Sequence, residues 1–219
     1  MFKYIPMSLD KKEHIMQVAM ELFAEKGFEG TSIRDLAHRA DVNIAMINYY
    51  FGSKEKLFEM LLENKARFMR DKVESIQNDK TISEFEKINL IIEGYVNRFL
   101  SQPDFHRVLQ QELLVTQRVI LHQNVIDLFV KNTECVVSII EKGIRKKIFK
   151  KVDPQLLFAT IIGTINQLMM SRTMCNTLMG KEKDFNPYAD PQLKKRLLNH
   201  IKQMVQDHLL IHPELQKLK

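Results

Sequence analysis

Apolar residues recur every three or four positions along most of the chain, a spacing that predicts helices rather than strands. The first helix has its apolar face within residues 15–23, and Gly27 follows it as a stop signal. Two short amphipathic segments come next, at residues 33–40 and 44–51. Asp41 lies in the tight break between them and is a residue type that tolerates a left-handed backbone.

The predicted helices lengthen after residue 53. Ser53 is placed to cap a helix that runs through about residue 77, and either Thr81 or Ser83 can cap the next one, which ends near residue 101. A short helix then starts at Pro103, and three longer ones cover residues 118–148, 154–179 and 191–211. With only 7 Gly and 6 Pro, the chain has too few turn residues for a β-sandwich or barrel, so an all-α fold is predicted.

The net charge of +6 does not by itself indicate a nucleic-acid site. Lys and Arg balance Asp and Glu over residues 1–80, and the whole excess of positive charge lies in residues 81–219. Basic clusters such as residues 145–151 are typical of solvated helix ends. The two cysteines fit no disulfide or metal spacing, and no apolar run is long enough to span a bilayer. These features predict a cytoplasmic protein without a membrane partner.

Residues 33–52 have the spacing of a helix-turn-helix, in which two short helices cross steeply at a tight turn. Ala37 is small where the two backbones must approach, and Val42 and Ile47 are placed to point inward. The outward face of the second helix then carries side chains suited to a major groove: Asn43, Ile44, Met46, Asn48, Tyr49 and Tyr50. On spacing alone, a purely structural pair of helices explains the pattern equally well.

The same segment resembles a known family. The matching pieces are Phe23-Ala24-Glu25-Lys26-Gly27-Phe28, Thr31-Ser32-Ile33-Arg34-Asp35-Leu36-Ala37, Val42-Asn43, Asn48-Tyr49-Tyr50-Phe51 and Ser53-Lys54-Glu55. Through them, residues 19–62 are similar to the N-terminal domain of TetR/AcrR-type transcriptional regulators, without gaps. The resemblance implies a three-helix helix-turn-helix domain at residues 1–55 that continues into a helix to about residue 78. A larger helical effector-binding and dimerisation bundle would occupy residues 56–219.

The resemblance also implies roles for individual residues on operator DNA. Thr31 would cap the second helix and bring its N-terminus to a phosphate, and Lys54 would contact another phosphate. Arg39 could reach the DNA backbone. Asn43 and Asn48 are the best candidates for base edges, because an amide can pair with adenine through two hydrogen bonds. The predicted DNA-binding set is Thr31, Ser32, Arg34, Asn43, Ile44, Met46, Asn48, Tyr49, Tyr50 and Lys54.

Apolar faces in the rest of the chain point to two further sites. Helices near residues 85–110 and 154–179 could enclose a pocket for an apolar or amphipathic small molecule, although plain core packing is the simpler explanation for any one side chain. The candidate pocket residues are Phe85, Ile88, Ile92, Tyr95, Phe99, Phe105, Leu109, Gln110, Phe158, Ile162, Ile165, Asn166, Gln167 and Met169. Helices 154–179 and 191–211 could form a four-helix dimer interface through Ala159, Gly163, Met170, Leu197, Leu198, Ile201, Met204, Val205 and His208.

The sequence therefore predicts a homodimeric regulator, a repressor that a small apolar or amphipathic effector releases from double-stranded operator DNA. One alternative is a regulator of the same fold that answers to a protein partner or to no ligand. Another is a ligand-binding or catalytic helical protein whose helix-turn-helix is vestigial.

Neither an enzyme nor a cofactor is predicted. The sequence contains no Gly-rich phosphate loop, nucleophile elbow or paired metal-ligand motif. His200, His208 and His212 fall near one another at the end of the chain. Histidines at an exposed terminus usually bind nothing, so no metal is predicted there.

Overall fold

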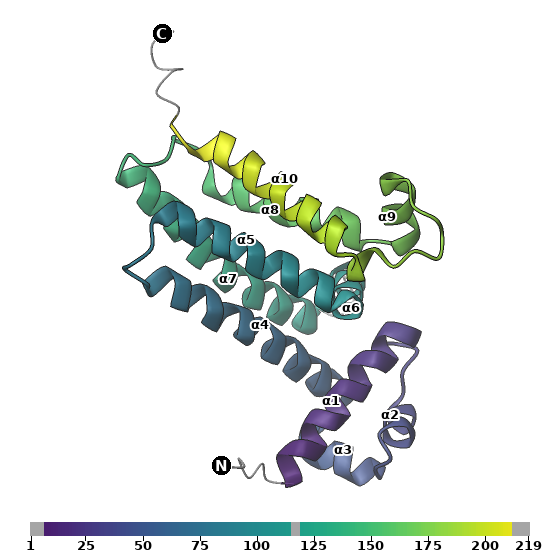
Figure 1. The fold of residues 1–219 in the computed structure, drawn as a ribbon. Coiled ribbons are helices and arrows are strands. Elements are labelled where there is room, and N and C mark those ends of the chain that lie inside the picture. The colour runs from purple at the N-terminus through teal and green to yellow at the C-terminus, as the bar shows by residue number, and fades with distance from the viewer. Residues whose placement is uncertain (1–6, 115–118, 212–219) are drawn as a thin grey trace, which may run out of the picture. The chain divides into compact units, whose positions relative to one another are not determined.

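A computed structural model describes residues 7–114 and 119–211 of the chain (Figure 1). Within these residues there are ten α-helices, one short 3-10 helix and no β-strand, which confirms the predicted all-α class. None of the helices in these two ranges is long and apolar enough to cross a membrane.

The chain divides into two compact units. Unit 1 comprises residues 1–67 and 104–128, and unit 2 comprises residues 68–103 and 129–219. The first boundary lies inside the long fourth helix, which therefore contributes to both units. Residues 104–128 group with the N-terminal helices, whereas the sequence-based division placed them in the second domain.

Unit 1 is built from α1 (Met7–Lys26), α2 (Ile33–Arg39), α3 (Ile44–Phe51), the start of α4 (Lys54–Asn78) and α6 (Pro103–Leu114). The rings of Phe23, Phe28 and Phe58 form an aromatic cluster in its core, with centroids 5.1 to 5.4 Å apart. α6 is tied to this unit by the Arg107 guanidinium, which donates to the Ala24 carbonyl at 3.4 Å.

Residues with a left-handed backbone follow the first three helices of unit 1. Gly27 follows α1 with φ 74°, Asp41 separates α2 from α3 with φ 52°, and Gly52 follows α3 with φ 77°. The conformation predicted for Asp41 is thus confirmed, and its short polar side chain tolerates the position better than most others would. These turns let α2 and α3 cross with Leu36 and Ile47 fully buried, as the helix-turn-helix spacing predicts.

Unit 2 is a bundle in which α8 (Pro154–Met169) and α10 (Pro191–Leu209) pack on α5 (Glu84–Ser101). Figure 1 shows α10 running alongside α5. The end of α4 and α7 (Val119–Arg145) also contribute to its core, and α9 (Arg172–Met179) and η1 (Pro187–Ala189) connect α8 to α10. The core is apolar and includes Ile88, Ile92, Tyr95, Val96, Ile140, Ile161, Ile165, Leu197, Ile201 and Val205.

Helix caps start the helices of unit 2. Of the two candidates for the start of α5, Ser83 is the cap, because its hydroxyl accepts from the backbone amide of Glu86 in the first turn of the helix. Asp153 caps α8, and Pro154 fills the first position, where a backbone N–H would have no helical partner. Asp190 caps α10 in the same way.

The single helix predicted over residues 154–179 is wrong, because the chain breaks into α8 and α9. Ser171 adopts an extended backbone, and its hydroxyl accepts from the Met174 amide at 3.3 Å as the cap of α9. A serine side chain can bond to nearby backbone groups and so competes with helix continuation. Gly180, with φ 66°, ends α9 at the predicted place.

Candidate DNA-binding interface

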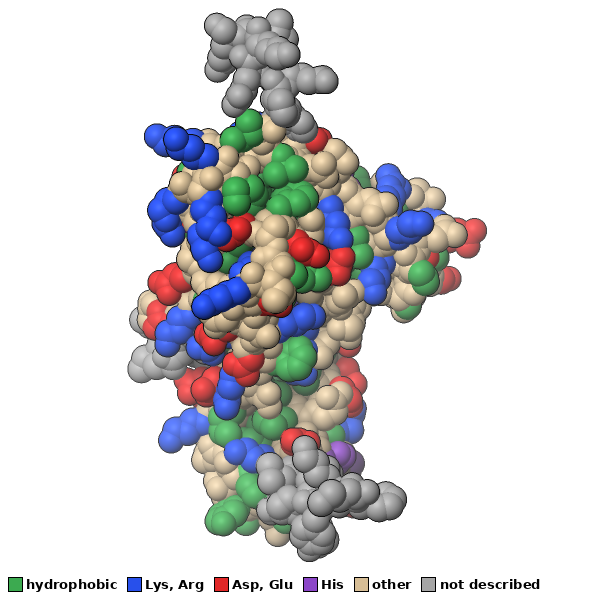
Figure 2. Space-filling model, turned by 60° about the vertical axis from the view of Figure 1, so that its left-hand side comes forward, with side chains coloured by type: hydrophobic (Ala, Val, Ile, Leu, Met, Phe, Trp, Pro, Cys, Tyr) green, Lys and Arg blue, Asp and Glu red, His purple; other side chains and the backbone are tan. Residues whose placement is uncertain are grey.

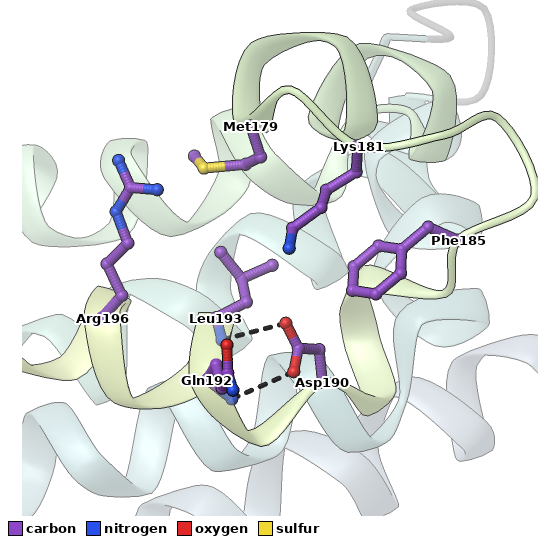
Figure 3. Close-up of a pocket in the computed structure, with 7 residues that line it drawn as sticks. All are labelled: Met179, Lys181, Phe185, Asp190, Gln192, Leu193 and Arg196. Atoms are coloured by element: carbon purple, nitrogen blue, oxygen red, sulfur yellow. Dashed lines mark hydrogen bonds between the residues drawn. The ribbon is translucent and has the colours of Figure 1, made fainter.

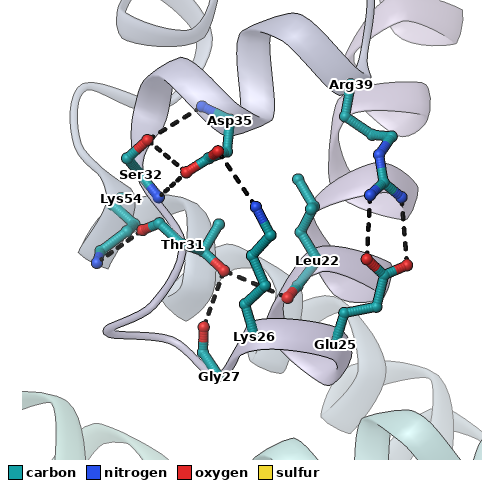
Figure 4. A network of polar contacts seen from close by, with 9 residues as sticks. All are labelled: Leu22, Glu25, Lys26, Gly27, Thr31, Ser32, Asp35, Arg39 and Lys54. Carbon is teal, nitrogen blue, oxygen red and sulfur yellow. Dashed lines mark hydrogen bonds and ion pairs between the residues drawn. The ribbon is translucent and has the colours of Figure 1, made fainter.

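The N-terminus of α2 is fixed by a capping box between Ser32 and Asp35 (Figure 4). The Ser32 hydroxyl accepts from the Asp35 amide at 3.1 Å, and the Asp35 carboxylate accepts from the Ser32 amide at 2.9 Å. The Lys26 ammonium donates to the same carboxylate at 3.2 Å. Hydrogen bonds from Ser32 and Lys26 lower the pKa of Asp35 from 3.8 to about 2. The carboxylate is therefore ionised at neutral pH and links α2 to α1.

Thr31 lies inside unit 1, only 1% exposed. Its hydroxyl faces the Gly27 carbonyl at 2.8 Å and the Leu22 carbonyl at 3.3 Å, so it bonds back to the end of α1 (Figure 4). The prediction that Thr31 caps α2 is wrong, because the cap is Ser32. Of the two adjacent hydroxyl residues, only Ser32 has an acidic partner three positions later, which is the spacing of a capping box.

Lys54, the first residue of α4, turns its ammonium back onto the segment between α1 and α2. Its Nζ donates to the Phe28 carbonyl at 2.9 Å and to the Thr31 carbonyl at 3.0 Å. The same ammonium lies 4.3 Å from the centroid of the Phe28 ring, a cation–π contact. Because an ammonium has three N–H groups, two of them are committed to the protein itself. Lys54 thus holds the start of α4 against the turn that precedes α2.

Arg39, considered above for the DNA backbone, is paired with Glu25 of α1. Two of its guanidinium nitrogens donate to the two carboxylate oxygens at 3.2 and 3.0 Å. The bond from Arg39 is the main cause that lowers the pKa of Glu25. Both side chains are exposed, so the pair is weak enough for a phosphate to compete with it. Arg34, on the same helix, is exposed.

Asn43 is the N-cap of α3, a role that the sequence analysis did not assign to it. Its Oδ1 accepts from the Met46 amide at 2.7 Å. Its side-chain NH2 is then the group that could reach a base or a phosphate. Asn48, one turn further along α3, is exposed.

The outward face of α3 exposes large side chains. Tyr49 is 84% exposed and Ile44 is 41% exposed, while Met46 and Tyr50 are half-buried. The ring of Tyr50 lies edge-on to that of Tyr49, with centroids 5.3 Å apart. An aromatic ring this open to water gains little from its surroundings, which is typical of a residue that meets a partner.

No charged side chain lies on α3, whose sequence is IAMINYYF. No acidic group on it would repel phosphates, and the amides at its N-terminus carry partial positive charge. The helix can therefore approach a polyanion and offer amide, hydroxyl and apolar groups to base edges. Positive charge is available beside it from exposed residues such as Arg34 and Lys56.

Most of the candidate pocket residues in unit 2 lie within its apolar core. Ile88, Ile92, Tyr95, Phe99, Phe158, Ile165 and Met169 are buried, and Phe85 and Ile162 pack against them. The Tyr95 ring meets the Phe158 ring edge-on at 5.6 Å. Burial raises the pKa of the Tyr95 hydroxyl above its usual range, so it stays protonated and able to donate. These side chains form a packed core.

The other candidate pocket residues are placed differently. Phe105, Leu109 and Gln110 belong to unit 1, where the first two are buried. Asn166 is half-buried on α8. Gln167 is exposed, and its amide lies 3.6 Å from the Met174 sulfur, so it does not face the core.

The predicted dimer residues separate into two groups. Leu197, Ile201 and Val205 are buried in the core of their own chain, so the prediction that they form a subunit interface is wrong. The reason is that α10 uses this apolar face to pack on α5. Of the remaining six, Ala159, Gly163, Met170 and His208 are exposed, and Leu198 and Met204 are half-buried.

A small cavity of about 90 Å³ lies where α9 and the loop after it meet the start of α10 (Figure 3). It is lined by Met179, Lys181, Phe185, Asp190, Gln192, Leu193 and Arg196. The Lys181 ammonium lies 5.0 Å from the centroid of the Phe185 ring, and the Asp190 carboxylate is occupied by the Gln192 and Leu193 amides. Its volume is well below the ~300–1,000 Å³ that is typical of small-molecule sites, so this cavity is too small for an amphipathic effector.

Metal and thiol chemistry find no support in the described part of the chain. It contains no group of three His, Cys, Asp or Glu side chains that could hold a metal ion. His200 and His208 are exposed on α10, and His212 lies outside the described residues. Burial raises the pKa of both the Cys135 and Cys175 thiols, which disfavours the reactive thiolate.

Sequence reasoning missed two buried charges in unit 2, Glu84 and Lys87. They are 6% and 3% exposed. A signal for them exists, because Glu84, Lys87, Ile88 and Ile91 follow the spacing of a single helical face. Charged residues that fall in line with an apolar stripe are expected to be buried with partners.

Two short helices joined by a tight turn, with an exposed and uncharged second helix, define a helix-turn-helix DNA-binding regulator. The family profile described as bacterial regulatory proteins, tetR family, matches residues 15–61. The profile described as tetracyclin repressor-like, C-terminal domain, matches residues 85–205, more than half of the chain. The chain belongs to the tetR family of transcriptional regulators.

Individual relatives are similar over parts of their length. "Probable HTH-type transcriptional regulator YttP" of Bacillus subtilis (strain 168) is 48% identical over 56 residues, 26% of this chain and 27% of that protein. The HTH-type transcriptional repressor NicS of Pseudomonas putida is 29% identical over 103 residues, 47% of this chain and 48% of that protein. The matches thus span less than half the length of these curated relatives.

Among solved structures, the transcriptional regulator FadR from Bacillus subtilis, in complex with stearoyl-CoA, has a TM-score of 0.68 to this chain. The two are 21% identical, and the match covers 86% of this chain and 96% of that one. This likeness shows a shared fold across both units.

Proposed function

We propose that this protein binds double-stranded operator DNA with α3 as its recognition helix. The observation that carries the proposal is the outward face of α3, which is uncharged and leaves Tyr49 84% exposed on an otherwise well-packed unit. Asn43, Asn48 and Tyr49 would read base edges, and Ile44 and Met46 would meet thymine methyl groups. Arg34, Tyr50 and the remaining N–H of Lys54 would contact phosphates. Thr31 and Ser32 would act by holding α2 in place.

We infer that the protein acts as a homodimer formed through α8. Leu156 is 66% exposed, and Ala159, Gly163 and Met170 continue the same stripe of apolar and small residues. A Cβ added at Gly163 would meet nothing within 4 Å, so this face is open. A second copy related by two-fold symmetry would cover the stripe and bring two recognition helices to one operator.

We infer further that unit 2 responds to an apolar or amphipathic small molecule. Its interior combines adaptable side chains, among them Met69, Met169 and Cys135, with the protonated hydroxyl of Tyr95. FadR, which shares the fold, was solved with stearoyl-CoA, an amphipathic ligand of this kind. Because the core is packed, a ligand would have to part these side chains. It would release DNA only by binding the DNA-free state more tightly.

The test is a selection of operators from random duplexes, followed by titration of the bound complex with stearoyl-CoA. We expect two-fold symmetric sites whose half-site centres lie about 10 base pairs apart, and release of the DNA by the acyl-CoA. Symmetric sites that are insensitive to acyl-CoA would favour control by a protein partner or by no ligand. Failure to select any sequence would contradict DNA reading by α3.

A further inference from the structure

A polar cavity of about 300 Å³ lies at the end of the unit-2 bundle where α4 and α7 end and α5 begins. Six of its lining residues are polar, and they are Gln77, Asn78, Glu84, Lys87, Ser138 and Lys142; the seventh is Ile139. Its volume lies at the lower end of the ~300–1,000 Å³ that is typical of small-molecule sites, so the cavity has room for a small polar molecule. This lining is the opposite of the apolar core that the effector would enter.

Lys87 is the central cation of this cavity. It is 3% exposed, although lysine is among the residues least often buried. Its ammonium donates to the Gln77 carbonyl at 2.7 Å, in the last turn of α4, where carbonyl groups lack helical partners. This bond uses one of three N–H groups, so the other two can be directed to a guest.

The other charges leave the cavity positive. The Glu84 carboxylate accepts from the Lys146 ammonium at 2.8 Å, and the Lys142 ammonium lies 3.5 Å from the same carboxylate. The bond from Lys146 lowers the pKa of Glu84, so this carboxylate stays ionised. Among the residues that line the cavity, two lysines, Lys87 and Lys142, stand against one carboxylate, that of Glu84. This end of the bundle, at the left in Figure 1, comes forward in Figure 2, where Lys and Arg side chains lie on it together with Asp and Glu side chains.

We propose that this cavity binds a small anion carrying carboxylate or phosphate groups, held by Lys87 and Lys142. The Gln77 amide donates one N–H to the Ser138 hydroxyl, and its second N–H and the amide of Asn78 would supply further hydrogen bonds. The bound anion would be a second effector, different in chemistry and place from the apolar one. An anion that contacts Gln77 would touch the last turn of α4, the helix that runs from unit 1 into unit 2, and could thereby change its position. This regulatory consequence rests on the proposed function, whereas anion binding does not.

The test is calorimetric titration of the full chain, without DNA, with citrate and with inorganic phosphate at constant ionic strength. We expect saturable binding of one anion per chain. The anion with the lower Kd shows whether the cavity prefers carboxylate or phosphate groups. Lys142→Gln should weaken binding about tenfold, the effect of removing one charge-assisted hydrogen bond. Lys87→Gln should weaken it further. Lys151→Gln removes the same charge from an exposed position outside the cavity and should change nothing.

Equal weakening in Lys142→Gln and Lys151→Gln, or binding that does not saturate, would overturn the proposal. Since Lys142 is half exposed, its variant decides the matter even if Lys87→Gln does not fold. Operator affinity is then measured with and without the anion. Anion binding that leaves operator affinity unchanged would contradict the regulatory consequence alone. Anion binding in a chain that selects no operator would leave the site intact and contradict the proposed function.

Discussion

The hydroxyl of Thr31 and the ammonium of Lys54 both bond to backbone carbonyls of the segment that joins α1 to α2. The Thr31 hydroxyl is buried and cannot meet a phosphate directly, whereas Lys54 keeps one of its three N–H groups for such a contact. Their role in the structure is to fix where α2 begins, while the exposed groups on α3 remain to meet DNA. Residues that look like DNA contacts in the sequence can thus act by holding the residues that make the contact.

Replacing Thr31 with valine should destabilise the protein by about 2 kcal/mol. The substitution keeps the shape of the buried side chain and takes away the hydroxyl that donates to the Gly27 carbonyl. Urea denaturation followed by circular dichroism measures the loss, and Thr31→Ser, which keeps the hydroxyl, should retain most of the stability. A Thr31→Val variant as stable as the wild type would contradict the anchoring role.

Lys54→Met should lower the free energy of unfolding by about 2 kcal/mol and weaken DNA binding, because two hydrogen bonds from a charged group are lost. Lys56→Met removes an exposed charge two residues away and should change stability by less than about 0.5 kcal/mol. Denaturation of the two variants side by side separates these outcomes. Equal stability of both would show that the bonds of Lys54 contribute nothing.

The capping box predicts a pH dependence of stability. Because folding lowers the pKa of Asp35 from 3.8 to about 2, its contribution is present above 3.8 and is lost as the pH falls toward 2. The melting temperature of Asp35→Asn should therefore lie below that of the wild type at neutral pH, and the gap should narrow in this acid range. A carboxyl titration by NMR that gives Asp35 an ordinary pKa would contradict the account. Ser32→Ala should raise the pKa of Asp35 only part of the way back to 3.8, because the backbone amide of residue 32 and the Lys26 ammonium still donate to the carboxylate.

At the scale of helices, local signals predicted most of the boundaries. Gly27 marks a helix end, and Ser53 and Ser83 mark helix starts, because each acts through bonds to its near neighbours. The break at Ser171 was missed because the apolar spacing continues through it into α9. Which element an apolar helix face packs against depends on tertiary contacts, which local spacing does not specify. For that reason the face of α10 was assigned to a second subunit when it packs on α5 of its own chain.

The exposed stripe of α8 leads to a prediction about assembly. Gly163→Glu should give a folded monomer, because the added side chain meets nothing in its own chain but would place charge in the subunit interface. Sedimentation velocity measures the assembly state, and Leu90→Glu on the outside of α5 is the control, which should remain a dimer. A dimer that persists in Gly163→Glu would place the interface elsewhere.

At the scale of the whole molecule, the sequence predicted the fold class and the helix-turn-helix because both depend on local spacing and on the family resemblance. It did not predict that residues 104–128 group with unit 1, since that depends on contacts distant in sequence such as Arg107 with Ala24. The polar cavity was missed for the same reason. Its residues come from three helices, and only packing brings Gln77, Lys87 and Lys142 together.

The central claim is that α3 reads DNA sequence, and fluorescence anisotropy across a salt series tests it most directly. The wild type, Asn48→Ala and Asn199→Ala are each titrated with the selected operator and with a scrambled duplex; Asn199 is an exposed asparagine of α10. The account predicts that wild-type affinity falls linearly with salt on logarithmic axes. Asn48→Ala should lose about tenfold in discrimination between the duplexes, whereas Asn199→Ala should match the wild type. Discrimination by Asn48→Ala equal to that of the wild type would contradict the claim.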